Sequence, residues 1–318
     1  MSAPAPQNRT RIVVVAGPTA SGKTAHAIAW AERMSGEIIN ADSQQVYRYM
    51  NVGTAKPSDE ERARIPHHLL DIVDPDDPYN AGRFEQDASA AIERISGRGK
   101  AVFLVGGTGL YIRAALEGLT TQIGRHPERR AQLEAEHKAA VEAGTPTKLH
   151  ERLAKIDPES AKRLHPNDAV RIIRAIEISE ATGRPASESF RSEKPARRYE
   201  VMTLVLDPGR DVLNARIDAR CEAMVKGGLL QEVRDLRERG YGPELASMRA
   251  IGYRHLQPVV DGVETLANVV EQMKHDTRQF ARRQRTWFRA VEGARWLDPE
   301  KDAETVAPDI ARFLEGAS

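Results

Sequence analysis

The chain has 318 residues, of which 40% are hydrophobic and 29% charged, with a formal net charge of +1. This length suits one large domain or one domain with an insertion, and the composition permits a substantial core. The balanced charge excludes nucleic-acid binding through overall charge, so such binding must use local clusters. The single cysteine, Cys221, excludes an internal disulfide framework and favours the cytoplasm.

Membrane insertion and secretion are not expected either. No apolar run reaches the roughly 18 residues of a membrane span. Residues 1–10 lack the apolar stretch of a secretory signal, so they are predicted to form a short disordered tail.

Predicted strands and helices alternate in the first third of the chain. A β-branched run at 11–16 is typical of a buried parallel strand, and a helical stretch follows at 23–34. Short apolar runs at 37–41 and 100–105 predict two more strands, with helical sequence around 81–95 between them. This alternation predicts an α/β fold with a parallel sheet and crossover helices.

The composition changes after about Gly124. Residues 125–198 have few aromatic residues, many charges and mostly helical patterning, with a small excess of basic over acidic residues. Residues 201–206 then indicate a return to the sheet, and residues 210–287 are again helical. The prediction is a catalytic core made of residues 11–122 and 199–318, interrupted by a helical insertion domain at 123–198.

Residues 17–24, GPTASGKT, match the phosphate-loop pattern G-x-x-x-x-G-K-[ST] between a predicted strand and a predicted helix. The glycines allow backbone N–H groups to face inward, and the helix N-terminus adds positive potential. Lys23 adds a full charge, and Thr24 offers a hydroxyl to Mg²⁺. The predicted diphosphate ligands are Gly17, Pro18, Thr19, Ala20, Ser21, Gly22, Lys23 and Thr24.

The strand at 100–105 differs from that of a typical phosphate-loop nucleotidase. Such enzymes carry a magnesium-binding aspartate after an apolar strand. Here the strand is followed by GGTGLY at 106–111, which contains no acidic residue. Glycines at a strand end allow a ligand to approach closely. The loop therefore predicts a bound phosphate or diphosphate and does not by itself predict nucleotide hydrolysis.

Asp42 follows the second predicted strand. Ligands of open parallel sheets lie at the carboxyl ends of the strands, where the phosphate loop also lies. A carboxylate there can bind Mg²⁺ or accept a proton. It can equally cap a turn, since an Asp-Ser pair is typical of that position. The residues alone leave these roles open.

Six motifs occur in order: GPTASGKT, ADSQQVYRYMNVGTAKP, GGTGLY, HPNDAVRIIRAIE, RAIGYRHL and ARRQRTWF. Together they resemble the tRNA dimethylallyltransferase family, also called isopentenyl-pyrophosphate:tRNA transferases, over residues 11–296. The resemblance implies a P-loop NTPase-like core. It also implies transfer of a dimethylallyl group from its diphosphate to the N6 amine of the adenosine 3′ of the anticodon. The tRNAs would be those reading codons that begin with U.

The resemblance also assigns roles to single residues. It implies that Asp42 is the general base, and that Lys23, Thr24 and Mg²⁺ stabilise the leaving pyrophosphate. Arg220 matches a diphosphate-binding arginine, but Arg216 lies one helical turn earlier on the same face, so either can be the anion ligand.

A second set of residues is predicted to bind tRNA. Basic residues recur at 274, 278, 282, 285 and 289, which places them on one helix face; a solvated charged face is the alternative. Tyr253 is expected either to stack on a base or to pack in the core. The full set is Asp42, Ser43, Gln44, Gln45, Thr108, Arg130, Val170, Arg171, Ile172, Ile173, Arg174, Arg249, Gly252, Tyr253, Lys274, Arg278 and Arg282.

The expected partners are the tRNA anticodon stem-loop and dimethylallyl diphosphate, and the chain is expected to be a monomer. Three alternatives stay open on sequence. One is a small-molecule kinase that uses ATP, and another is an RNA-binding module with a regulatory phosphate loop. The third is an isopentenyltransferase that acts on free AMP, although the insertion and the basic helix favour an RNA substrate. The histidines show no metal-ligand spacing, so no zinc site is expected.

Overall fold

The computed structural model of the chain describes residues 9–119, 126–192 and 198–316. The chain forms two compact units, Met1–Glu117 with Arg197–Ser318, and Gly118–Ala196. Apart from its last two residues, the tail predicted at 1–10 lies outside the described residues. The helical insertion was predicted at 123–198, and the helical unit of the structure spans Gly118–Ala196.

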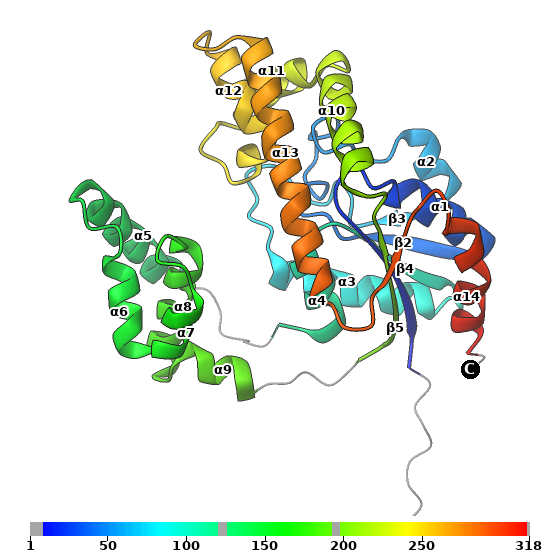
Figure 1. Cartoon of the computed structure of the whole chain (residues 1–318), viewed down its shortest axis with the longest axis horizontal. Coiled ribbons are helices and arrows are strands. Elements are labelled where there is room, and N and C mark those ends of the chain that lie inside the picture. Colours follow the sequence, from blue (N-terminus) through cyan, green and yellow to red (C-terminus); the bar gives the residue numbers. More distant parts are fainter. Residues whose placement is uncertain (1–8, 120–125, 193–197, 317–318) are drawn as a thin grey trace, which may run out of the picture. The chain divides into compact units, whose positions relative to one another are not determined.

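The larger unit is built on a parallel sheet, shown in Figure 1, that has six strands among the described residues. Its spatial order is β3-β2-β4-β1-β5-β6. Ala16, the last residue of β1, is level with Gly106 of β4 and Val205 of β5. The loops that follow these strands therefore meet at one edge. The strands are β1 (Arg11–Ala16), β2 (Gly36–Asn40), β3 (His67–His68), β4 (Ala101–Gly106), β5 (Glu200–Leu206) and β6 (Arg295–Leu297).

Helices cover both faces of the sheet, so alternate side chains of each strand pack in different layers. In β1, Ile12 and Val14 pack in the layer that contains α3, α10 and α13, whereas Val13 and Val15 pack against α1 and α14. The helices of this unit are α1 (Lys23–Arg33), α2 (Asp59–Arg64), α3 (Ala81–Ser96), α4 (Gly109–Glu117), α10 (Arg210–Lys226), α11 (Leu229–Glu238), the 3₁₀ turn η1 (Ser247–Arg249), α12 (Tyr253–Val260), α13 (Leu266–Arg289) and α14 (Ala303–Glu315).

The smaller unit is helical and has its own core, built around Leu133, Leu153, Ile172 and Ile176. The buried Asp157 begins α7 by accepting a hydrogen bond from the backbone N–H of Ser160 at 3.0 Å, which satisfies a free donor of the first turn. The helices are α5 (Pro127–Glu142), α6 (Lys148–Ile156), α7 (Pro158–Arg163), α8 (Ala169–Thr182) and α9 (Ala186–Ser192).

The predicted α/β class with a parallel sheet is confirmed. All four predicted strands are present, each within one or two residues of its expected bounds. The edge strands β3 and β6 were not predicted, because two or three residues are too few to show a strand pattern. None of the described helices is both long enough and apolar enough to span a bilayer.

Candidate active site

The phosphate loop, residues 17–22, has a backbone that requires glycine at its start. Gly17 has a φ of 152°, and a Cβ there would lie 2.5 Å from the carbonyl oxygen of Leu206. Gly22, with a φ of 84°, leads directly into α1. Ala20 has a φ of 64°, a left-handed conformation that costs a residue other than glycine roughly 1–2 kcal/mol. Such a tight turn allows successive N–H groups to converge on a phosphate.

The ammonium group of Lys23 lies against this loop. Its Nζ donates a hydrogen bond to the carbonyl oxygen of Pro18 at 3.2 Å. Burial lowers the pKa of Lys23 to about 8; the Asp42 carboxylate opposes this shift and the Arg220 guanidinium adds to it. Asp42 and Arg220 are thus close enough to Lys23 to affect its titration. Two cations and one carboxylate share this site.

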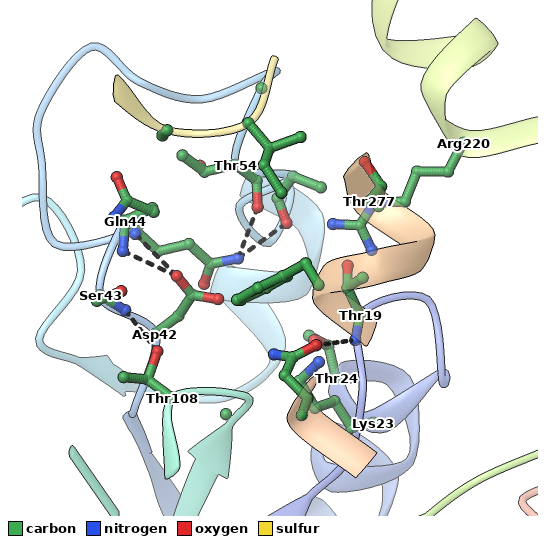
Figure 2. Close-up of a pocket in the computed structure, with 18 of the residues that line it drawn as sticks. Thr19, Lys23, Thr24, Asp42, Ser43, Gln44, Thr54, Thr108, Arg220 and Thr277 are labelled. Atoms are coloured by element: carbon green, nitrogen blue, oxygen red, sulfur yellow. Dashed lines mark hydrogen bonds between the residues drawn. The ribbon is translucent and has the colours of Figure 1, made fainter. Parts of the chain in front are cut away.

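Asp42 follows β2 at the same edge of the sheet. Its Oδ1 accepts hydrogen bonds from the backbone N–H groups of Gln44 at 2.8 Å and Gln45 at 3.4 Å (Figure 2). These bonds close a turn in which an aspartate side chain replaces a backbone acceptor. Oδ2 takes no part in this turn. The turn predicted as one alternative is therefore present, and it leaves one carboxylate oxygen for chemistry.

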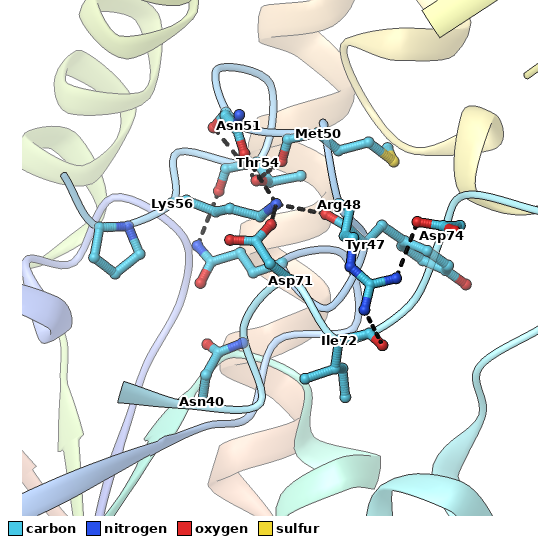
Figure 3. A network of polar contacts seen from close by, with 12 residues as sticks. Asn40, Tyr47, Arg48, Met50, Asn51, Thr54, Lys56, Asp71, Ile72 and Asp74 are labelled. Atoms are coloured by element: carbon cyan, nitrogen blue, oxygen red, sulfur yellow. Dashed lines mark hydrogen bonds and ion pairs between the residues drawn. The ribbon is translucent and has the colours of Figure 1, made fainter. Parts of the chain in front are cut away.

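The loop that follows Asp42 is held by a buried lysine, Lys56, whose side chain is 2% exposed (Figure 3). Its ammonium group donates to the carbonyl oxygen of Tyr47, Oδ1 of Asn51 and the carboxylate of Asp71. On α11, Glu232 accepts hydrogen bonds from the three backbone N–H groups of residues 51–53, at 2.8–3.1 Å. These contacts fix the loop that forms one wall of the site.

Thr108, after β4, joins the ends of two strands. Its Oγ1 accepts a hydrogen bond from the N–H of Ser43 at 3.0 Å, and its own N–H donates to the carbonyl oxygen of Ala41 at 3.2 Å. At Gly106, a Cβ would lie only 2.2 Å from that carbonyl oxygen. The glycine therefore allows β4 to end against β2, which brings Thr108 next to the turn of Asp42 (Figure 2).

The two arginines of α10 have different surroundings. Arg220 lines the cavity, and burial lowers its pKa while Asp42 opposes the shift. Arg216 is ion-paired with Glu300 and is not among the residues that line the cavity. The sequence left open whether Arg216 or Arg220 binds the diphosphate. The structure favours Arg220, because it lines the cavity, whereas Arg216 would have to give up its ion pair with Glu300.

A cavity of about 330 Å³ collects these residues at the carboxyl edge of the sheet. Its polar side is formed by residues of the phosphate loop, the Asp42 turn and Thr108. Its less polar side comes from helices α10 and α13, with Thr277 between apolar neighbours. The residues of this second side are Ile217, Cys221, Met224, Met273, Thr277 and Phe280. The cavity can therefore hold a small molecule with an anionic end and an apolar end.

Two family models match the chain: IPP transferase over residues 45–291 and isopentenyl transferase over residues 10–73. The tRNA dimethylallyltransferase of Anaeromyxobacter dehalogenans is 49% identical, over 95% of this chain and 99% of that protein. The chain belongs to the tRNA dimethylallyltransferase family. Another member, tRNA dimethylallyltransferase 2 of Geotalea uraniireducens, is 45% identical over 97% of this chain and 98% of its own length.

A solved structure from the tRNA dimethylallyltransferase family has the same fold. It is the full-length tRNA isopentenylpyrophosphate transferase of Bacillus halodurans, which is 37% identical, covers 98% of each chain and has a TM-score of 0.71. The predicted P-loop NTPase-like core is confirmed by this likeness and by the parallel sheet that carries the phosphate loop.

The basic face of α13 is less free than its sequence indicates. Lys274 is 9% exposed and donates to Glu222 and Glu271 at 2.8 Å each. Arg278 pairs with Asp218. Lys274 stays a predicted tRNA contact, but its ammonium group already pairs with two carboxylates. Arg282 is exposed and stays a predicted tRNA contact.

Four other residues expected to touch tRNA are buried in this structure. Tyr253 is fully buried and donates its hydroxyl hydrogen to Glu232 at 2.6 Å, so it is a core residue, and Gly252 beside it is also buried. Ile172 and Ile173 are 1% and 3% exposed in the core of the helical unit.

Other predicted contacts of the helical unit differ in exposure. On α8, Val170 is 66% exposed. The side chain of Arg171 is 69% exposed, although it pairs with Asp168 at 2.9 Å, so both residues stay predicted contacts. Arg130 and Arg174 pair with the buried Glu177, at 3.9 and 3.0 Å. In the larger unit, Arg249 is exposed and lines the cavity.

Sequence reasoning also missed residues of the cavity. Gln284, Phe280 and Thr277 line it from α13, and Arg283 does so from the same helix. The signal was present in the motif ARRQRTWF, where a glutamine interrupts a run of arginines. From the sequence, only the basic residues of this helix were assigned a function.

Proposed function

We propose that this chain transfers the dimethylallyl group of dimethylallyl diphosphate to the N6 amine of the adenosine 3′ of the tRNA anticodon, with Asp42 as general base. The tRNAs are those that read codons beginning with U. The observation that supports this assignment is the cavity in which one carboxylate, Asp42, is joined by two cations, Lys23 and Arg220. The names of the relatives favour this reaction over phosphate transfer from ATP.

In this proposal the donor lies between the phosphate loop and α10. Lys23 and Arg220 hold the diphosphate, where their charges stabilise the leaving pyrophosphate more strongly than they would in water. The Thr24 hydroxyl lines the same cavity and, with the diphosphate oxygens, provides the hard ligands that Mg²⁺ prefers. When bound, the metal would neutralise charge on the leaving group. Met224 and Met273 lie where the dimethylallyl chain needs apolar contact.

The acceptor adenine must leave its stack before its amine can enter a cavity of this kind. The amine nitrogen forms a bond to C1 of the donor while the C1–oxygen bond breaks, and pyrophosphate leaves with the electron pair. The amine becomes acidic as it bonds to carbon. Oδ2 of Asp42, which the turn does not use, accepts the released proton.

The remainder of the tRNA would be held outside the cavity. Arg249 and Arg283 are exposed and line the cavity, so their guanidinium groups suit phosphates near the extruded base. Contacts with an RNA backbone distinguish tRNA from free AMP as the acceptor. We further propose that the chain acts in the cytoplasm as a monomer; sedimentation of the purified protein will test the oligomeric state.

The proposal is tested by incubating the chain with Mg²⁺, dimethylallyl diphosphate and bulk tRNA, followed by mass spectrometry of the digested nucleosides. The expected product is N6-(dimethylallyl)adenosine. At short incubation times this product should be absent from samples that contain the Asp42→Asn variant. Parallel samples contain AMP in place of tRNA, or γ-labelled ATP in place of the donor. A prenylated AMP, a labelled phosphate product or no prenylated nucleoside would each overturn the assignment.

A further inference from the structure

Gln284 of α13 connects the phosphate loop to the end of β4. Its Oε1 accepts a hydrogen bond from the backbone N–H of Thr19 at 2.8 Å, which Figure 2 shows as a dashed line at Thr19. Its Nε2 donates to the carbonyl oxygen of Gly107 at 2.9 Å. A backbone N–H can only donate and a carbonyl oxygen can only accept, so these two partners fix the orientation of the amide.

The site around Gln284 is closely packed. The side chain is buried, with 6% of the residue exposed. A Cβ on Gly107 would lie 2.2 Å from the Gln284 nitrogen, so the glycine is required for the amide to reach this position. Gly107 is itself buried. Both polar groups of the buried Gln284 side chain are thus hydrogen-bonded. One of the two partners, Thr19, lies 265 residues earlier in the same chain.

The residues next to Gln284 strengthen the same junction. Arg285 pairs with Asp207, directly after β5, at 2.7 Å. Trp287 lies so close to Gly109, at the start of α4, that a Cβ there would be 2.0 Å from the indole nitrogen. One turn of α13 therefore touches the segments that follow β1, β4 and β5. The helix is held in a fixed place against the carboxyl edge of the sheet.

The position of the Thr19 contact matters for the phosphate loop. Thr19 precedes Ala20, whose φ of 64° is a conformation that residues with a side chain rarely adopt. A strained conformation persists only where its surroundings hold it. The hydrogen bond from Thr19 to Gln284 connects the loop to another helix, directly before the strained Ala20. Lys23 follows Ala20 by three residues. Gln284 can therefore keep the loop in shape before any ligand binds.

We propose that Gln284 is a positioning residue that holds the phosphate loop in its donor-binding conformation. It acts through Thr19 and Gly107 and touches neither the reacting carbon nor the amine. The inference rests on the proposed function for the identity of the donor. It predicts that loss of the Gln284 bonds weakens donor binding before it affects the tRNA.

Gln284→Met tests this, because methionine has a similar length and forms neither hydrogen bond. Dissociation constants for dimethylallyl diphosphate are measured by calorimetry with Mg²⁺ and without tRNA, so the result does not depend on turnover. Two hydrogen bonds of ordinary strength predict a donor affinity lower by between about 5-fold and about 100-fold. The affinity for tRNA should stay within about twofold. Gln279→Met, at an exposed position of the same helix, is the matched control and should bind the donor like the unaltered chain.

Melting curves distinguish positioning from a structural role. If Gln284 only stabilises the fold, the Gln284→Met variant will have a lower melting temperature, but its folded fraction will bind the donor with normal affinity. That result would overturn the inference. If Gln284→Met does not fold, Gln284→Asn is used in its place. Its amide is one methylene shorter, so it stays polar but cannot reach both partners. Unchanged donor affinity in folded Gln284→Asn would also overturn it. A chain that binds the donor but makes no prenylated tRNA would refute the proposed function alone.

Discussion

The titration of Lys23 predicts how donor binding depends on pH. Burial lowers the pKa of this residue from 10.5 to about 8. The diphosphate binds the protonated ammonium group, so donor affinity should change little between pH 7 and pH 8. Above pH 8 it should fall by about tenfold for each pH unit, because the proton must first be returned to Lys23.

Two variants separate this effect from other titrations. Lys23→Arg keeps a charge at every pH of the experiment, so its donor affinity should not show the loss above pH 8. Lys23→Met should bind the donor weakly at all pH values but should stabilise the fold. A pKa shift from 10.5 to about 8 corresponds to about 3 kcal/mol of unfolding free energy, because the folded chain holds the charged form less favourably. That cost is fully present below pH 8 and disappears as the pH rises toward 10.5.

The assay is calorimetric titration of dimethylallyl diphosphate with Mg²⁺ from pH 7 to 9.5, with urea unfolding of each variant at the same pH values. The expected result is a bend near pH 8 in the unaltered chain and none in Lys23→Arg. Equal pH profiles for the two proteins would refute the reasoning. So would a Lys23→Met variant that is less stable than the unaltered chain at pH 7, since the buried charge would then carry no cost.

Three further outcomes are expected. Asp42→Asn keeps an oxygen for the turn to the backbone, so single-turnover rates should fall by roughly 10²–10⁴ while the melting temperature and donor affinity stay nearly the same; a rate loss matched by lost donor affinity would indicate a metal ligand instead. Tyr253→Phe should cost about 1–3 kcal/mol in urea unfolding, because Glu232 loses a buried partner, and a drop in tRNA affinity beyond the unfolded fraction would contradict its place in the core. Arg278→Ala with Arg282→Ala should reduce the log–log salt slope of tRNA binding by roughly 0.7–0.9 per lost phosphate contact, whereas an unchanged slope would mean that this face is only solvated.

The sequence was sufficient for the features that depend on strand ends. Parallel strands deliver their following loops to one edge, so a phosphate motif after one strand and Asp42 after another had to be neighbours. The glycines at 106 and 107 were interpreted as points of close approach, and each is packed against another segment. These inferences need only the order of strands and the chemistry of single residues.

Exposure and pairing of charged side chains were not predictable in the same way. Lys274 is neutralised in part by Glu222, which is 52 residues earlier, and Arg278 by Asp218, which is 60 residues earlier. A helical period shows which residues share a face, but not which other helix covers that face. For the same reason the sequence could not decide between base stacking and core packing for Tyr253, because its partner Glu232 belongs to another helix.

The topology of the sheet has a consequence for how the chain matures during synthesis. Strand β1 lies between β4 and β5, and Arg11 pairs with Glu200, 189 residues later. At ribosomal speeds of roughly 5–20 residues per second, β1 waits about 10–40 seconds for that neighbour. The described core residues of the helical unit lie between 133 and 186, and the unit ends at Ala196, so its whole sequence is available before β5 emerges.

We therefore expect the helical unit to become protease-resistant on the ribosome before the larger unit, whose sequence is completed later. The phosphate loop is among the earliest parts of the chain to be translated, yet its tether to Gln284 can form only after 265 more residues have been added. A nascent chain arrested before residue 284 would carry the complete loop sequence without this tether. The substrate site is then one of the last parts of the molecule to be finished.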